Sequence, residues 1–162
     1  MLPCFAAHSC FETTTDNLWR AISEEDVLVS WFHPKGCSIV QSSLDLYPEG
    51  IFHYKMQGPD GGIFWGRWLF TRVEPSRNLA FRMSFSAENK NEVVRSPWDP
   101  SWPLEVHSVF RIHSVKDAVK LSVSWSPWQP SPEEAHSFER TNSVMSDGWA
   151  YMFSELRKVV LG

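Results

Sequence analysis

The sequence predicts an α+β fold in which a curved antiparallel sheet of about six to seven strands wraps a long C-terminal helix, with two short helices near the N-terminus. Residues 37–126 largely alternate apolar and polar side chains with a period of two, which indicates strands. The flanking segments 11–32 and 132–160 repeat their apolar residues every three to four positions, as helices do. Because a sheet with one apolar face must cover that face, the C-terminal helix is expected to lie on it.

Length, charge and cysteine content narrow the class of protein. The chain of 162 residues predicts one domain, over residues 1–162, and its formal charge of −4 without a basic stripe argues against nucleic-acid binding. No apolar run approaches a bilayer span and the start lacks a signal-peptide pattern, so neither membrane insertion nor export is expected. The three cysteines are odd in number and lack CxxC spacing, which favours a reduced, cytoplasmic location over disulfides or a zinc site.

Two short helices are expected after a short N-terminal segment. Asp16 is the expected N-cap of the first, and Ser23, with Asp26 three residues later, is the expected cap of the second. The sequence His-Pro-Lys-Gly at 33–36 then ends the helical pattern, because proline restricts the residue before it and glycine frees the turn.

The central segment reads as a series of antiparallel strands. "IFHYKMQ" and "IFWGRWLFTRV" flank "GPDGG", a strong hairpin signal, and "NLAFRMSFSAE", "EVHSVFRIHSV" and "AVKLSVSWSPW" follow. Trp65 and Trp68 lie three apart on one strand and must face opposite sides of the sheet. One is expected to face the core and the other to meet another segment or a second chain, which makes a homodimer one expected assembly.

The C-terminal helix has a clear predicted start and an unusual apolar stripe. Ser131 is the expected N-cap and Pro132 suits the first turn. Gly148 beside the stripe is expected to let the helix backbone approach the sheet or a ligand closely. The stripe follows a spacing of three to four and consists of Phe138, Asn142, Met145, Trp149, Met152, Leu156 and Val159.

Five strings, in order, carry a family resemblance: "LWRAISEEDVLVSWFHP", "DLYPEGIFHYKMQGPDG", "VEPSRNLAFRMSFSAEN", "WPLEV" and "MSDGWAYMFSELRKVV". From about residue 11 to the end, the chain resembles the activator of Hsp90 ATPase homologue 1-like family, a branch of the Bet v 1-like, START-related helix-grip superfamily. It departs from the family pattern at Tyr47, Glu49 and Ala87, where the family has arginine, glycine and aspartate. The resemblance implies a bent sheet that grips the long helix, with a cavity between them. Members of the superfamily bind sterols, lipids or polyketides, and a minority catalyse cyclisation or hydrolysis.

The favoured function is therefore non-catalytic binding of a small apolar or amphipathic molecule between sheet and helix. Methionine is flexible and polarisable, which suits an irregular ligand, and no cofactor, metal or catalytic residue is assigned. The expected lining combines inward-facing strand residues, the stripe of the C-terminal helix and the end of the second short helix: Trp31, Phe32, Phe52, Tyr54, Met56, Phe81, Met83, Phe85, Phe110, Val123, Trp125, Met145, Trp149 and Met152.

Two other function classes remain open. A chaperone-interaction module, like the Hsp90 co-chaperone domain, would bind its partner through an outer surface. A cyclase- or hydrolase-type enzyme would need a polar cluster in the cavity, and Glu105 and His107, two apart on a strand, are the candidate acid–base pair. The histidines show no metal-ligand spacing.

Overall fold

The computed structural model describes residues 2–161, and its main feature is one eight-stranded antiparallel sheet. The strands follow the order β1-β8-β7-β5-β4-β3-β2, with the two-residue β6 paired to β5. This arrangement and its long C-terminal helix confirm the predicted fold class. The elements in chain order are β1 (Phe5–Phe11), α1 (Thr15–Ser23), α2 (Glu25–Trp31), β2 (Ser38–Leu44), β3 (Ile51–Gln57), β4 (Ile63–Glu74), β5 (Asn78–Ser86), β6 (Val93–Val94), β7 (Val106–Val115), β8 (Ala118–Pro127), α3 (Pro132–Arg140) and α4 (Asn142–Leu161).

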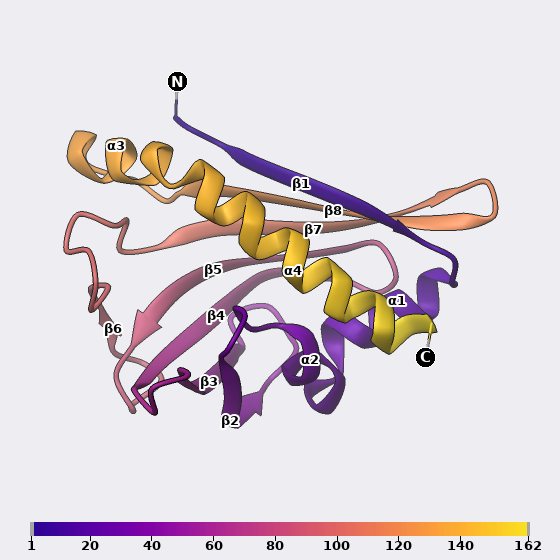
Figure 1. The fold of residues 1–162 in the computed structure, drawn as a ribbon, viewed down its shortest axis with the longest axis horizontal. Coiled ribbons are helices and arrows are strands. Elements are labelled where there is room, and N and C mark those ends of the chain that lie inside the picture. The colour runs from indigo at the N-terminus through magenta and orange to yellow at the C-terminus, as the bar shows by residue number, and fades with distance from the viewer. Residues whose placement is uncertain (1, 162) are drawn as a thin grey trace.

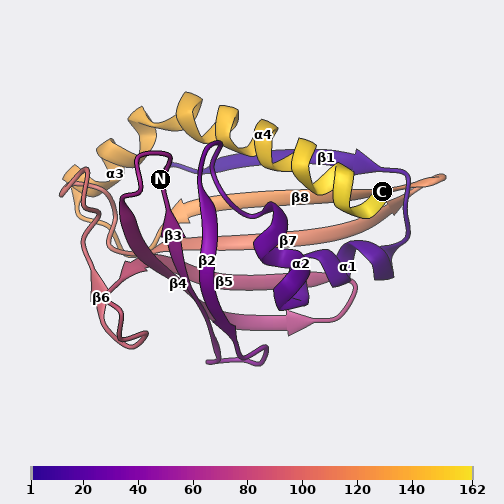
Figure 2. The same cartoon turned by 60° about the horizontal axis from the view of Figure 1, so that its bottom comes forward.

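The sheet bends around α4. This helix crosses the sheet diagonally (Figure 1), and β2 and β3 run across the direction of β7 and β8 (Figure 2). Helices α1 and α2 pack beside the C-terminal half of α4 and close that end of the sheet. The concave face is therefore covered by helices along much of its length, as a sheet with one apolar face requires.

The two tryptophans of β4 face opposite sides of the sheet. Trp68 is fully buried on the concave side and stacks on Phe81, with ring centroids 3.9 Å apart. Trp65 lies on the outer side, where it stacks on His53 at 4.7 Å and the Lys55 ammonium lies 5.7 Å from its ring centroid. Neighbours in the same chain thus cover much of Trp65, and a homodimer remains a prediction.

The helix starts differ in detail from the predicted caps. Thr14, not Asp16, caps α1, since its hydroxyl oxygen accepts a hydrogen bond from the Asn17 N–H at 3.1 Å. Glu24, not Ser23, occupies the N-cap of α2, and the Ser23 hydroxyl instead donates to the Trp19 carbonyl at 2.6 Å. Both predictions were wrong because several cap-forming residues follow one another here, and sequence preference alone does not choose among them.

The predicted helix over 132–160 is interrupted once. Ser131 caps α3 as predicted, in a reciprocal capping box with Glu134, but α3 ends at Arg140 and α4 begins at Asn142. At the break, the Thr141 hydroxyl donates to the Phe138 carbonyl at 2.8 Å. Such back-bonding by threonine competes with the helical hydrogen-bond pattern and bends helices.

The turn before β3 yields a stability prediction. Glu49 has a φ of 72°, which is left-handed backbone, while a Cβ on the neighbouring Gly50 would lie 2.1 Å from the Asp45 carbonyl oxygen. We expect Glu49→Gly to raise the free energy of unfolding by about 0.5–1 kcal/mol, because it relieves the left-handed conformation at an exposed position. Gly50→Ala should lower it by about 2–3 kcal/mol, because the backbone must move. Urea unfolding of both variants measures this, and a destabilising Glu49→Gly would contradict it.

Candidate functional site

A cavity of about 990 Å³ lies between α4 and the concave face of the sheet. Strands β3, β4 and β5 provide one wall, Val106 of β7 and Trp125 of β8 continue it, and α4 provides the opposite wall. The hairpin turn at 58–62 and the loop at 96–102 complete the lining. The lining is predominantly aromatic and aliphatic, as in sites that bind small apolar molecules.

The structure divides the residues predicted for the lining into two groups. Five are fully buried in the core and do not border the cavity: Trp31, Phe52, Phe81, Phe110 and Val123. The other nine border it: Phe32, Tyr54, Met56, Met83, Phe85, Trp125, Met145, Trp149 and Met152. Contact of these residues with a ligand remains a prediction.

The loop over 95–102 contributes cavity residues that strand and helix patterns did not indicate. Trp98 is 67% exposed, yet its ring contacts Phe64 and Phe85 with centroids 5.0 and 5.6 Å away. Trp102 lies further along the loop and stacks on Phe138 of α3. Prolines flank the two tryptophans in the sequence, which predicts a rigid lid over the pocket or part of a contact with a second chain. In the structure, both tryptophans line the cavity.

Polar contacts fasten this loop to the start of α3. The Ser137 hydroxyl donates to the Asp99 carboxylate at 2.6 Å, and the Ser101 hydroxyl donates to Glu133 at 2.5 Å. Arg95 pairs with Glu134, which is also part of the capping box. Asp99 accepts hydrogen bonds from the Ser137 hydroxyl and from the Ser101 backbone N–H. These bonds lower the pKa of Asp99, so this cavity residue is an ionised carboxylate near neutral pH.

Gly148 and Gly66 shape opposite walls of the cavity. A Cβ on Gly148 would meet nothing within 4 Å, so the expected close approach of the helix backbone to the sheet at this residue is wrong. A Cβ on Gly66 would lie 2.6 Å from the Tyr54 hydroxyl oxygen, because the Tyr54 ring lies flat across this glycine of the neighbouring strand. The lack of a side chain at Gly66 therefore makes room for the Tyr54 ring.

Two of the ionisable side chains that line the cavity, Tyr54 and Cys37, are held neutral. Burial raises the pKa of the Tyr54 phenol well above its ordinary value. Burial, assisted by Asp60, also raises the pKa of the Cys37 thiol. Neither group is therefore present as an anion at neutral pH, which argues against a thiolate or phenolate nucleophile here.

The candidate acid–base pair lies on the opposite face of the sheet. Glu105 pairs with Arg82 at 3.3 Å and Arg67 at 4.0 Å, on the outer side. His107 pairs across the sheet with Arg82, and its ring lies 6.0 Å from that of Trp128. Between them, Val106 is the residue that borders the cavity. This pair therefore cannot act on a molecule held in the cavity.

The buried His53 on the outer face predicts a pH-dependent stability. Its Nε2 lies 3.1 Å from the Ser86 hydroxyl oxygen, and burial lowers the pKa of His53 against the opposing effect of the Ala87 carbonyl. Since His53 then binds a proton more readily in the unfolded chain than in the folded protein, protonation favours unfolding. The contribution of His53 to stability is fully present above the pKa of 6.5 that applies to the unfolded chain, and it falls as the pH drops below that value. The pKa of His107 is lowered by burial in the same sense.

We therefore expect the free energy of unfolding to decrease between about pH 7.5 and about pH 5.5, as measured by urea titrations at several pH values. In the His53→Gln variant, the free energy of unfolding should decrease less steeply over this pH range. The remaining decrease should be the part due to His107. An unchanged slope in that variant would contradict the assignment to His53.

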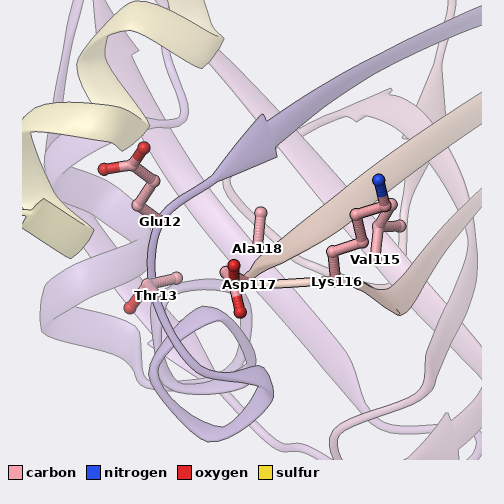
Figure 3. A pocket seen from close by; sticks show the side chains of 6 residues that line it. All are labelled: Glu12, Thr13, Val115, Lys116, Asp117 and Ala118. Atoms are coloured by element: carbon pink, nitrogen blue, oxygen red, sulfur yellow. The ribbon is translucent and has the colours of Figure 1, made fainter.

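A second, shallower hollow lies where the end of β1 meets the β7–β8 turn (Figure 3). Two of its lining residues follow β1, Glu12 and Thr13. The other four lie at the turn between β7 and β8: Val115, Lys116, Asp117 and Ala118. The hollow is open to solvent, and its side chains come from surface segments (Figure 3). Its lining lacks the predominantly apolar side chains of the larger cavity.

Two further findings concern residues 2–161 only. No group of three or more His, Cys, Asp or Glu side chains in this range is arranged to hold a metal ion. None of the helices in this range has the length and apolarity to cross a bilayer.

Comparison with known families decides the classification. The model of the family described as activator of Hsp90 ATPase homolog 1-like protein matches residues 12–160. The chain belongs to this family. No functionally curated protein matches the sequence.

Solved structures support the fold of this Hsp90 ATPase activator homolog 1-like chain. A crystal structure of a protein from Nitrosomonas europaea superposes with a TM-score of 0.75 at 20% identity, covering 96% of this chain and 92% of that one. A solution structure of a protein from Arthrobacter aurescens superposes with a TM-score of 0.77 at 19% identity, covering 97% of this chain and 85% of that one. The crystal structure of the AHSA1 protein from Silicibacter pomeroyi superposes with a TM-score of 0.71 at 14% identity, covering 96% of each chain. At these identities the likeness concerns the fold alone.

Proposed function

We propose that this protein binds a small apolar or amphipathic molecule, of lipid, sterol or polyketide-like type, in the cavity between α4 and the sheet, without catalysing a reaction. The observation that carries the proposal is the cavity of about 990 Å³ with an aromatic and methionine-rich lining. Its size suits a drug-sized or larger ligand, and flexible methionines adapt to irregular shapes. A cytoplasmic location is part of the proposal and is supported by Cys4, Cys10 and Cys37, which are all free.

The position of the ionisable groups supports binding over catalysis. The ionisable side chains of the lining are Cys37, Tyr54, Asp60 and Asp99. Asp60 lies on the exposed hairpin turn, and Asp99 is engaged with Ser137, so neither is paired with a base inside the cavity. A cyclase- or hydrolase-type enzyme would require such a pair beside the substrate.

A chaperone-interaction module is the second candidate, because the family takes its description from an activator of the Hsp90 ATPase. That function would depend on an outer surface, with or without a homodimer. The two candidates are separable, because cavity substitutions should impair only the binding of a small molecule.

Native mass spectrometry of freshly purified protein tests the proposal. We expect an adduct that disappears on denaturation, or a thermal shift with members of a lipid, sterol and polyketide panel. Met152→Ala, which alters the cavity wall, should weaken either signal. Val159→Ala should not, because Val159, predicted to continue the buried stripe, is 37% exposed and does not border the cavity. A native mass equal to that of the protein alone, together with no thermal shift across the panel, would contradict the proposal.

A further inference from the structure

The outer face of β1, β8 and β7, three neighbouring strands (Figure 2), carries a group of basic side chains. Their neighbours along the strands, such as Phe110 and Leu121, are buried on the concave side, so alternation turns the basic side chains outward. We call this group the outer basic cluster, and its members are His8, Arg111, His113 and Lys120. The first three are exposed and Lys120 is half-buried, so all four are accessible from solvent.

The strand register brings the cluster together. Ser122 on β8 lies opposite His8 of β1 on one side and Arg111 of β7 on the other. Lys120, two residues earlier on β8, lies opposite His113. Since neighbouring strands are about 5 Å apart, the four side chains occupy adjacent rows within two strand spacings, about 10 Å.

The members of the outer basic cluster make no ion pair within residues 2–161. Cations elsewhere on the outer face are paired. Arg67 and Arg82 share Glu105, and Arg72 pairs with Glu74 at 3.7 Å. The charge of the cluster is therefore available to a partner, whereas the charge of the neighbouring part of the sheet is already compensated.

The surface around the cluster fits an extended segment. Ala6, Ser122 and Ser124 lie between or beside its members, and their short side chains leave the face low. Alternate side chains of an extended chain are about 6.5–7 Å apart, which is also the spacing of Arg111 and His113 along β7. Carboxylates accept hydrogen bonds from arginine, lysine and histidine, so an acidic segment is complementary in both charge and spacing.

Other anionic partners fit this surface less well. The outward-facing residues of β1, β7 and β8 include no Phe, Tyr or Trp on which nucleic-acid bases would stack. A bilayer surface would need large apolar anchors, which this cluster also does not present. Beyond the cluster, the chain's formal charge of −4 repels a long polyanion, whereas a short acidic segment meets only the local field.

We propose that the outer face of β1, β8 and β7 binds an acidic segment of a partner protein, whose carboxylates pair with the outer basic cluster. This face is opposite to the cavity, so the proposal is independent of small-molecule binding. It also gives a location to the outer surface on which an interaction with another protein would depend.

Titration of hexaglutamate into the ¹⁵N-labelled protein at low ionic strength tests the proposal, with hexaglutamine as the uncharged probe. Hexaglutamate alone should shift the amide resonances of β1, β7 and β8, and raising the salt from about 20 to about 300 mM should weaken its binding. The double variant Arg111→Glu/Lys120→Glu should bind it at least about tenfold more weakly. Lys35→Glu/Lys158→Glu, which changes the net charge equally at exposed residues outside this face, should weaken binding much less.

The outcomes decide the nature of the surface. Absence of binding, shifts confined to other strands, or equal weakening in the two double variants would overturn the proposal. Tighter binding of oligothymidylate or of phosphatidylglycerol vesicles than of hexaglutamate, at equal salt, would also overturn it, in favour of a nucleic acid or a membrane. The apolar probe methyl decanoate reports separately on the cavity and should bind the Arg111→Glu/Lys120→Glu variant as it binds the wild type.

Discussion

Trp68→Ala is expected to lower the free energy of unfolding by about 3–5 kcal/mol, the range found when a fully buried aromatic side chain is removed from a core. Trp68 is fully buried at the centre of the concave face. Removing it would leave a cavity among rings that cannot all collapse into it. Five phenylalanines contact its ring, with centroids 3.9–6.3 Å away: Phe32, Phe52, Phe70, Phe81 and Phe110.

Trp65→Ala on the same strand is the control for this prediction. Trp65 is only half-buried, and its contacts are a stacked His53 and the Lys55 ammonium. We expect Trp65→Ala to lower the free energy of unfolding by about 1 kcal/mol. Chemical denaturation with matched m-values measures both variants. Equal losses for Trp65 and Trp68 would contradict the assignment of the two side chains to opposite faces.

Gly148→Leu is expected to weaken ligand binding by at least about tenfold while leaving the protein folded. A side chain at this residue would extend into open space at the cavity, since nothing lies within 4 Å of its Cβ position. Leucine also favours helix over glycine by about 0.5–1 kcal/mol, so folding should not suffer. The measurement is a titration with an apolar probe such as methyl decanoate, followed by intrinsic tryptophan fluorescence.

Two variants of α4 control this experiment. Ala150→Leu places the same side chain on the exposed face of the helix and should leave binding unchanged. Gly148→Ala should raise stability by up to about 1 kcal/mol with little loss of binding, because a methyl group occupies little of the cavity. Binding by Gly148→Leu as tight as that of the wild type would place the ligand elsewhere.

The period of the apolar residues was sufficient to predict the architecture. In β8, Val119, Leu121 and Val123 are buried and the intervening residues are more exposed, as alternation predicts. The predicted N-cap Ser131 likewise marks the start of α3 in the structure. These features are local, and local patterns determine secondary structure and which face of it is buried.

The boundary between core and cavity could not be predicted in this way. Phe81 and Met83 both face inward on β5, but Phe81 stacks under Trp68 while Met83 borders the cavity. Periodicity identifies the face of a strand, not what lies above each residue on it. That depends on where α4 crosses the sheet and on the bend at Thr141, both of which arise from tertiary packing.

The sequence marks the segment around Trp98 as a candidate lid, but the contacts that position this loop and the role of Gly66 were beyond local patterns for a related reason. The loop is positioned by contacts with α3. Arg95 of the loop and Glu134 of α3, for example, are about 40 residues apart in the chain. Gly66 matters because the ring of Tyr54 on a neighbouring strand lies across it. Both depend on a partner that no local signal identifies.

The most direct test of the central claim is anomalous diffraction from crystals grown with a bromine-labelled methyl decanoate. We expect one ordered bromine inside the cavity, between Met152 of α4 and the wall formed by Tyr54 and Met83. Bromine ordered only outside this cavity, or a cavity without bromine at a concentration that saturates binding in solution, would contradict it.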